Sequence, residues 1–149
     1  MNMKIKQKIT DNLSSPERIN ALEKRCSIVL PEDYRTFLVN TNGGKPVERK
    51  FAFIENGRQT HSGVNCFFAD CENQMNGLDS ILKIYAGRIP DSFFPIATDS
   101  FGNLILMSCR NNDRNTIYFW DHEKENDPPS LANMIPVANS FSEFIEQLV

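Results

Sequence analysis

With 149 residues, of which 40% are hydrophobic and 23% charged, the chain has the length and composition of one ordinary globular domain. No window approaches the roughly 20 apolar residues that span a bilayer, and no apolar segment of a secretion signal follows the lysines of residues 1–13. A net charge of −3 argues against a general nucleic-acid binder and favours a basic partner. We therefore expect one cytoplasmic domain over residues 1–149, without membrane or direct nucleic-acid contact.

The four cysteines are scattered along the chain, at Cys26, Cys66, Cys71 and Cys109. They form no Cys-x-x-Cys pair, and a zinc site would require a second pair of ligands at matching spacing. Reduced thiols in a cytoplasmic protein are the expected state. The sequence thus predicts neither a metal nor an organic cofactor.

The first half of the chain is predicted to begin with helices. Residues 1–13 place apolar side chains four positions apart, which fits a short amphipathic helix or a frayed end. Ser14 and Glu17 have capping-box spacing around Pro16, so a helix should begin there. A second helix is expected within residues 30–44, because Pro31 and two acidic residues precede its apolar face and two glycines follow it. Tyr34 on that face suits partner binding if exposed, but burial against a sheet with its hydroxyl satisfied at the rim is favoured.

Residues 45–76 are harder to interpret. Residues 51–54 and 64–68 have strand composition and are expected to pair as a hairpin around a polar turn at 55–58 and the stretch to Gly63. Residues 77–87 then place apolar side chains at helical spacing and end in Gly87, which predicts a third helix.

Residues 93–123 carry the longest continuous strand pattern. Three apolar and aromatic runs, each bounded by turn residues, lie at 96–98, 104–108 and 116–120. In the turn after the first run, Gly102 can supply a positive φ and Asp99 can accept hydrogen bonds from nearby backbone amides. The polar residues 110–115 separate the other two runs. This pattern predicts a three-stranded antiparallel meander with Trp120 as a structural anchor.

The last third of the chain contains a loop and a helix. Residues 121–130 are polar and contain two prolines, which predicts a loop. Ser140 and Glu143 form a second capping box before an apolar face, so the chain should end in a helix. Early helices, central strands and later helices together predict an α+β domain, mainly an antiparallel sheet with helices packed against it.

No catalytic constellation emerges from the sequence. His122 lies between Asp121 and Glu123, which suggests metal or acid–base chemistry, but successive side chains of a strand point to opposite faces. The three side chains converge only if the strand has already ended. The favoured interpretation is therefore that these are polar residues at the end of a strand, without a chemical role. His61 has no nucleophile elbow or cysteine beside it, and no phosphate-binding glycine signature occurs.

Several sequence blocks occur in a recognisable order. They are residues 19–23, 30–38, 42–44 (Asn-Gly-Gly), 94–99, 102–103, 117–123 and 140–143. Spanning residues 19–149, this series resembles the SUKH superfamily, bacterial immunity proteins that share a domain with fungal cell-wall assembly regulators. The resemblance implies a non-enzymatic protein that binds and neutralises a cognate bacterial toxin, with a nuclease favoured. The alternative that it also implies is a regulatory or scaffolding module with another cellular partner.

Four carboxylates, Asp121, Glu123, Glu125 and Asp127, alternate with other polar residues, and Asp99 lies in a turn of the same meander. Charge patterning alone fits a solvated loop and a binding surface equally well. The resemblance favours binding, because an inhibitor of a nuclease toxin must compete for a surface that holds phosphates. We therefore predict these five carboxylates as partner-binding residues, with residues 45–76 as the alternative region.

Overall fold

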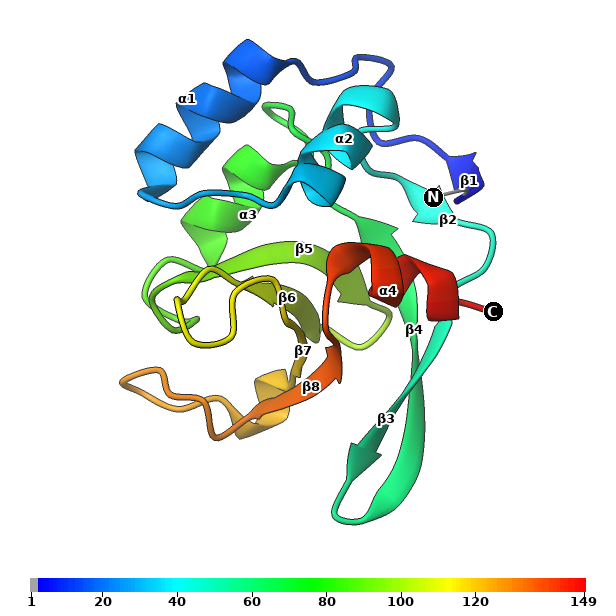
Figure 1. Cartoon of the computed structure of the whole chain (residues 1–149), viewed down its shortest axis with the longest axis vertical. Coiled ribbons are helices and arrows are strands. Elements are labelled where there is room, and N and C mark those ends of the chain that lie inside the picture. The colour runs from blue at the N-terminus through cyan, green and yellow to red at the C-terminus, as the bar shows by residue number, and fades with distance from the viewer. Residues whose placement is uncertain (1–2) are drawn as a thin grey trace.

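The computed structural model describes residues 3–149, which form an α+β arrangement around one antiparallel sheet (Figure 1). The sheet contains six strands in sequential order: β3 (Lys50–Glu55), β4 (Arg58–Phe67), β5 (Phe93–Asp99), β6 (Leu104–Ser108), β7 (Ile117–Trp120) and β8 (Met134–Ala138). The helices are α1 (Pro16–Cys26), α2 (Glu32–Asn40), α3 (Leu78–Ile84) and α4 (Phe141–Gln147). The predicted fold class is confirmed.

Strands β5, β6 and β7 are the predicted meander, with β5 starting earlier than expected, at Phe93. In the register between β6 and β7, Leu104 lies opposite Trp120 and Ile105 lies opposite Phe119. Since neighbouring side chains of a strand point to opposite faces, Trp120 and Phe119 lie on different faces of the sheet. Every residue of β6 is buried, so both faces of the meander are covered.

Helices α2 and α4 cover the face that carries Phe119. The ring of Phe141 in α4 lies 5.1 Å from that of Tyr34 in α2, and Phe144 lies 5.3 Å from Phe51 in β3. Phe51 in turn lies 6.3 Å from Phe119. Strand β3 also lies beside β8, so the sheet curls until its first and last strands meet around this aromatic core.

Trp120 points to the opposite face, toward α3. Its side chain is only 1% exposed, and its ring packs edge-on against Tyr85, the residue that ends α3, at 5.9 Å. The predicted burial of Trp120 is therefore confirmed, with α3 as the helix that covers it.

The Asn-Gly-Gly segment after α2 fastens this helix to the sheet. Asn42 takes a left-handed conformation (φ 58°), and its amide oxygen accepts a 2.7 Å hydrogen bond from the backbone N–H of Asp70. Gly44 exchanges two backbone hydrogen bonds with Phe67, both 2.9 Å long. Between them, Gly43 has φ 79°, and a Cβ there would lie 2.8 Å from three backbone atoms of residues 67–69. Only glycine fits this approach without displacing the strand.

The start of α1 differs from the prediction by one residue. Ser15, not Ser14, caps the helix by accepting a hydrogen bond from the backbone N–H of Arg18. Ser14 is buried, and its hydroxyl donates to the Asp70 carboxylate at 2.5 Å. Ser14 therefore bonds to a distant residue instead of capping the helix. With Ser15 as the cap, Glu17 is the second helical residue and not the third, as the predicted capping box requires.

The N-terminal segment is not helical where the structure describes it. Residues Ile5–Gln7 form β1, which pairs with β2 (Lys45–Pro46) in a separate two-stranded sheet. Met1, part of the amphipathic pattern, lies outside the described residues. Pairing with a distant strand overrides a periodicity that only four residues supported.

The predicted hairpin is present, but its second strand is longer than expected. The two strands turn at Asn56-Gly57, both with positive φ, and the stretch from Arg58 to Gly63 is strand instead of loop. Strand β8 was not predicted from the sequence. Pro136 interrupts its apolar pattern, and an edge strand tolerates a proline that a central strand would not.

Tyr34 is fully buried, as favoured, but its hydroxyl has no hydrogen-bond partner in the described part of the chain, so the prediction of a satisfied hydroxyl is wrong. An unsatisfied buried hydroxyl costs about 1–3 kcal/mol. Tyr34→Phe keeps the ring and its contact with Phe141, so we expect equal stability or a gain of about 1 kcal/mol in urea unfolding. A loss of more than about 1 kcal/mol would show that the hydroxyl makes a stabilising hydrogen bond.

Asp113 organises the loop between β6 and β7. Its carboxylate accepts hydrogen bonds from the Arg110 guanidinium and from the hydroxyls of Ser108 and Tyr118. The Arg110 bonds are the largest cause that lowers the pKa of Asp113, and the two hydroxyls lower it further.

Asp113→Asn should consequently cost stability in a pH-dependent way. A carboxyl with a lowered folded-state pKa stabilises the fold above its unfolded pKa of about 3.9 and loses this contribution as the pH falls toward the folded value. At pH 7 we expect a loss of about 1–2 kcal/mol, typical of hydrogen bonds to a charged group at the surface. Urea unfolding from pH 7 to 3 should show the difference between parent and variant shrinking below about pH 4. A constant difference would contradict this role of the charge.

Candidate partner-binding surfaces

The acidic residues after β7 lie on a turn that projects from the sheet. His122–Lys124 form a short 3-10 helix, which Asp121 caps by accepting a 3.0 Å hydrogen bond from the backbone N–H of Glu123. Glu123 and Asp127 are exposed, and neither carboxylate takes part in an ion pair within residues 3–149. The segment from Asp121 to Asp127, called the acidic loop below, therefore presents charge directly to solvent.

The first two residues of the acidic loop are hydrogen-bonded to the body of the domain. Asp121 exchanges two 2.9 Å hydrogen bonds with Asn133, which is buried. The side-chain oxygen of Asn103 accepts a 3.0 Å hydrogen bond from the backbone N–H of His122 and lies 2.7 Å from its Nδ1. These contacts fix the start of the loop relative to the sheet.

Glu125 is a further anchor of the loop. Its carboxylate receives two hydrogen bonds from the Arg88 guanidinium, 2.9 and 3.0 Å long, and these bonds lower the pKa of Glu125. Arg88 also stacks on the ring of Tyr85, 4.6 Å from its centroid. Glu125 thus ties the loop to the segment that follows α3, and its side chain is only partly exposed.

Asp99 does not belong to this surface. Its side chain is 3% exposed, and its carboxylate accepts hydrogen bonds from the backbone N–H groups of Phe101 and Asn103, the Asn103 amide and the Ser62 hydroxyl. The predicted turn geometry, with Gly102 at φ 87°, is confirmed. Because the turn itself satisfies this carboxylate, we remove Asp99 from the proposed interface.

Neither histidine belongs to a group of metal-ligating side chains in the described residues. Within residues 3–149, no three His, Cys, Asp or Glu side chains are grouped closely enough to hold a metal ion. His122 follows the end of β7, so the geometric objection from strand alternation no longer applies, yet its ring nitrogen contacts Asn103 instead of the flanking carboxylates. His61 is exposed on β4 opposite Ala52.

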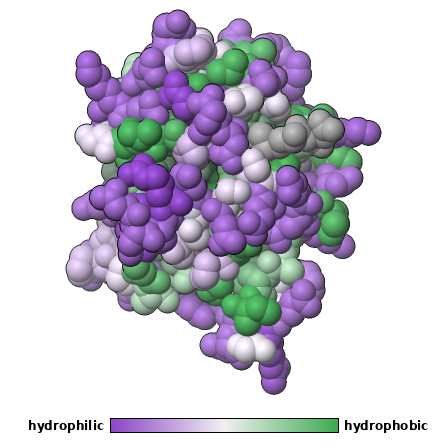
Figure 2. Space-filling model, in the orientation of Figure 1, coloured by the Kyte–Doolittle hydropathy of each residue, from purple (hydrophilic) through white to green (hydrophobic). Residues whose placement is uncertain are grey.

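The acidic loop and the β3–β4 hairpin are neighbours at one end of the molecule (Figure 1). Lys124 of the loop lies 3.6 Å from the carboxylate of Glu55, the last residue of β3. Beside Glu55, Ile54 is 61% exposed, and Figure 2 shows apolar side chains on the projecting hairpin among hydrophilic ones. The predicted interface and the alternative region at residues 45–76 therefore adjoin each other.

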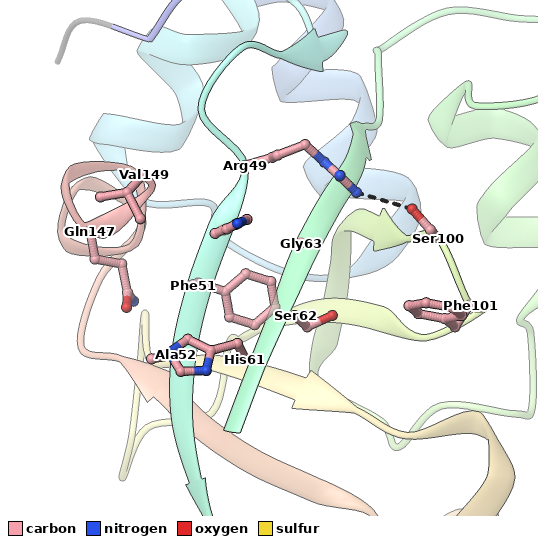
Figure 3. Close-up of a pocket in the computed structure, with 11 residues that line it drawn as sticks. Arg49, Phe51, Ala52, His61, Ser62, Gly63, Ser100, Phe101, Gln147 and Val149 are labelled. Carbon is pink, nitrogen blue, oxygen red and sulfur yellow. Dashed lines mark hydrogen bonds between the residues drawn. The ribbon is translucent and has the colours of Figure 1, made fainter. Parts of the chain in front are cut away.

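A separate groove of about 780 Å³ lies on the outer face of the same hairpin (Figure 3). Its floor and walls are Arg49, Lys50, Phe51, Ala52, His61, Ser62, Gly63, Ser100, Phe101, Gln147 and Val149. Arg49 crosses it, donating hydrogen bonds to the carbonyl of Val64 (3.0 Å) and the hydroxyl of Ser100 (3.1 Å). The groove was not predicted from the sequence, because the stretch up to Gly63 was expected to be a loop, whereas it is part of β4. The adjacent basic pair Arg49-Lys50 before an alternating strand was the available signal.

The curled sheet, the helices on its two faces and these open surfaces define a small α+β domain whose candidate sites lie on its exterior. Residues 14–147 match the model of the SMI1 / KNR4 family (SUKH-1), and the chain belongs to this family. The chain is also 29% identical, over 155 aligned residues, to the SPbeta prophage-derived uncharacterized protein YokK of Bacillus subtilis strain 168. That alignment covers 93% of this chain and 76% of the relative. No helix among residues 3–149 combines the length and apolar character needed to cross a membrane.

Proposed function

We propose that this protein is a cytoplasmic, non-enzymatic immunity protein that binds a cognate bacterial toxin and blocks it, with a basic nuclease domain as the favoured target. Membership of the SUKH-1 family and a prophage-derived relative support this assignment. Direct nucleic-acid binding is disfavoured, since the net charge is −3.

The observation that carries the proposal is the conformation of the acidic loop. Exposed carboxylates on a flexible loop lose side-chain and backbone entropy when a partner binds. Here Asn133, Asn103 and Arg88 already hold the loop at Asp121, His122 and Glu125, so Glu123 lies on an ordered segment before binding, and Asp127 follows it by two residues. A preorganised negative surface of this kind steers and orients a basic partner. The exposed side chain of Leu131, in the same connection between β7 and β8, offers an apolar contact next to these charges.

A regulatory or scaffolding module with another cellular partner is the alternative, supported by the domain that the family shares with fungal proteins. Gene neighbourhood separates the two. An adjacent long gene that ends in a toxin domain would favour immunity.

Charge reversal of the acidic loop should slow toxin association. For the double variant Glu123→Lys/Asp127→Lys, we expect the association rate constant to fall about tenfold at low salt with little change in dissociation, because rim charges act mainly on encounter. The effect should shrink as salt rises, since screening shortens the reach of exposed charges. Surface binding kinetics against the cognate toxin domain, at low and moderate salt, measure both rates.

The matched control is Glu17→Lys/Glu72→Lys, which makes the same change in net charge at two exposed residues outside the acidic loop, one in α1 and one between β4 and α3. Helix α1 lies at the opposite end of the molecule from the β3–β4 hairpin (Figure 1). Glu125→Lys is a less clean probe, because it also breaks the ion pair with Arg88. Unchanged rates in the loop variant, or equal effects in loop and control variants, would remove the acidic loop from the interface.

A further inference from the structure

The groove on the outer face of the β3–β4 hairpin is locally basic on an acidic protein. Arg49, Lys50 and His61 line it, whereas no aspartate or glutamate side chain does. Neither Arg49 nor Lys50 takes part in an ion pair within the described residues. The nearby carboxylate of Asp99 is buried and accepts hydrogen bonds from its own turn and from the Ser62 hydroxyl. No acidic side chain that lines the groove therefore offsets the positive charge of Arg49 and Lys50.

Arg49 is held ready for a ligand. Its Nε and one terminal nitrogen are fixed by Val64 and Ser100, and its guanidinium lies over Gly63, where a Cβ would come within 3.1 Å of it. A guanidinium has five N–H donors, and the two hydrogen bonds described use only two of them. The remaining donors suit a carboxylate, which arginine binds in a planar, two-pronged geometry.

Apolar groups accompany these charges. Ala52 forms part of the floor, and Phe101 and Val149, which are 75% and 76% exposed, lie on opposite sides of the groove (Figure 3). Among the lining residues only Phe51 is buried, so the site is an open trough on the surface and would not enclose a small molecule. Pockets for small ligands usually bury most of the ligand surface.

From this combination we propose that the groove is a second docking surface, which binds an extended peptide segment carrying acidic residues on both sides of a large apolar side chain. The carboxylates of the segment pair with Arg49 and Lys50, and the apolar side chain lies over Ala52 against Phe101. The proposal does not depend on the acidic loop, because the two surfaces have opposite charge and share no lining residue.

The probe is a fluorescein-labelled peptide, Asp-Glu-Leu-Phe-Asp-Glu, titrated with the full chain in a fluorescence anisotropy assay. Two control peptides replace the acidic residues by lysine and arginine, or Leu-Phe by Ser-Ser. We expect saturable binding of the first peptide only, weakening as salt rises. Lys50→Glu should weaken it about tenfold and Ala52→Glu at least as much, while Lys24→Glu on α1 should have no effect. Thermal melts establish that each variant is folded.

Several outcomes would overturn the proposal. Absence of saturable binding, equal binding of the three peptides, or an equal effect of Lys50→Glu and Lys24→Glu would each do so. Complete displacement of the peptide by inorganic phosphate, added at the same concentration of negative charge as the peptide, would show that the groove is a site for small anions and would also overturn the proposal. The double variant Glu123→Lys/Asp127→Lys should bind the peptide as well as the parent does, so the failure of one surface is distinguishable from that of the other.

Discussion

Trp120→Ala should lower the free energy of unfolding by about 3–5 kcal/mol, the cost of truncating a large buried aromatic side chain. Trp120 is almost completely buried between the sheet and α3, where its ring meets Tyr85. Alanine would leave a cavity under the helix and remove the edge-to-face contact. Because Arg88 stacks on Tyr85 and binds Glu125, the same cavity should also loosen the anchor of the acidic loop.

Urea or thermal unfolding of parent and variant measures this loss. Met75→Ala is the matched control, because Met75 is also a large apolar residue but is 85% exposed, and surface substitutions usually change stability by less than about 0.5 kcal/mol. A melt of Trp120→Ala within a degree or two of the parent would contradict the burial of this side chain.

Gly43→Ala adds only one methyl group, yet it should lower the free energy of unfolding by about 2–5 kcal/mol. Roughly 1–2 kcal/mol comes from placing a Cβ in the left-handed conformation, and about 1–3 kcal/mol comes from overpacking. The overpacking arises because the new methyl group would lie 2.8 Å from backbone atoms of residues 67–69, which the side-chain flexibility of a neighbour cannot relieve.

Gly57→Ala separates the two contributions. Gly57, in the turn of the β3–β4 hairpin, has nearly the same φ (76°) as Gly43 (79°), but a Cβ added at Gly57 would meet no atom within 4 Å. We expect Gly57→Ala to lower the free energy of unfolding by only the cost of the left-handed conformation, about 1–2 kcal/mol. Equal losses for both variants in urea unfolding would show that the close approach at Gly43 contributes nothing.

Local signals were sufficient to predict most of the fold. The meander, the cap of α4 by Ser140 and the glycines that follow α2 each depend on residues close together in sequence, and the structure contains all three. The failures involve long-range partners. Ser14 bonds to Asp70, 56 residues away, and β1 pairs with a strand that follows two helices.

The candidate surfaces were only partly predictable for the same reason. The sequence identifies the acidic loop, but not that Asp99 is buried in its own turn or that Glu125 is paired with Arg88, 37 residues away. The basic groove combines residues 49–52, 61–63 and 100–101 with Gln147 and Val149. No single sequence window contains that combination, so only the folded chain brings it together.

The most direct test of the assignment as an immunity protein is a titration of this chain against the toxin domain encoded beside it. The two purified proteins are mixed at increasing ratios, and complex formation is followed by size-exclusion chromatography together with the activity of the toxin domain. We expect a stable complex of one chain with one toxin domain and loss of toxin activity at that ratio. A toxin domain that neither co-elutes with the chain nor loses activity at excess would contradict the proposed function and favour a regulatory or scaffolding role.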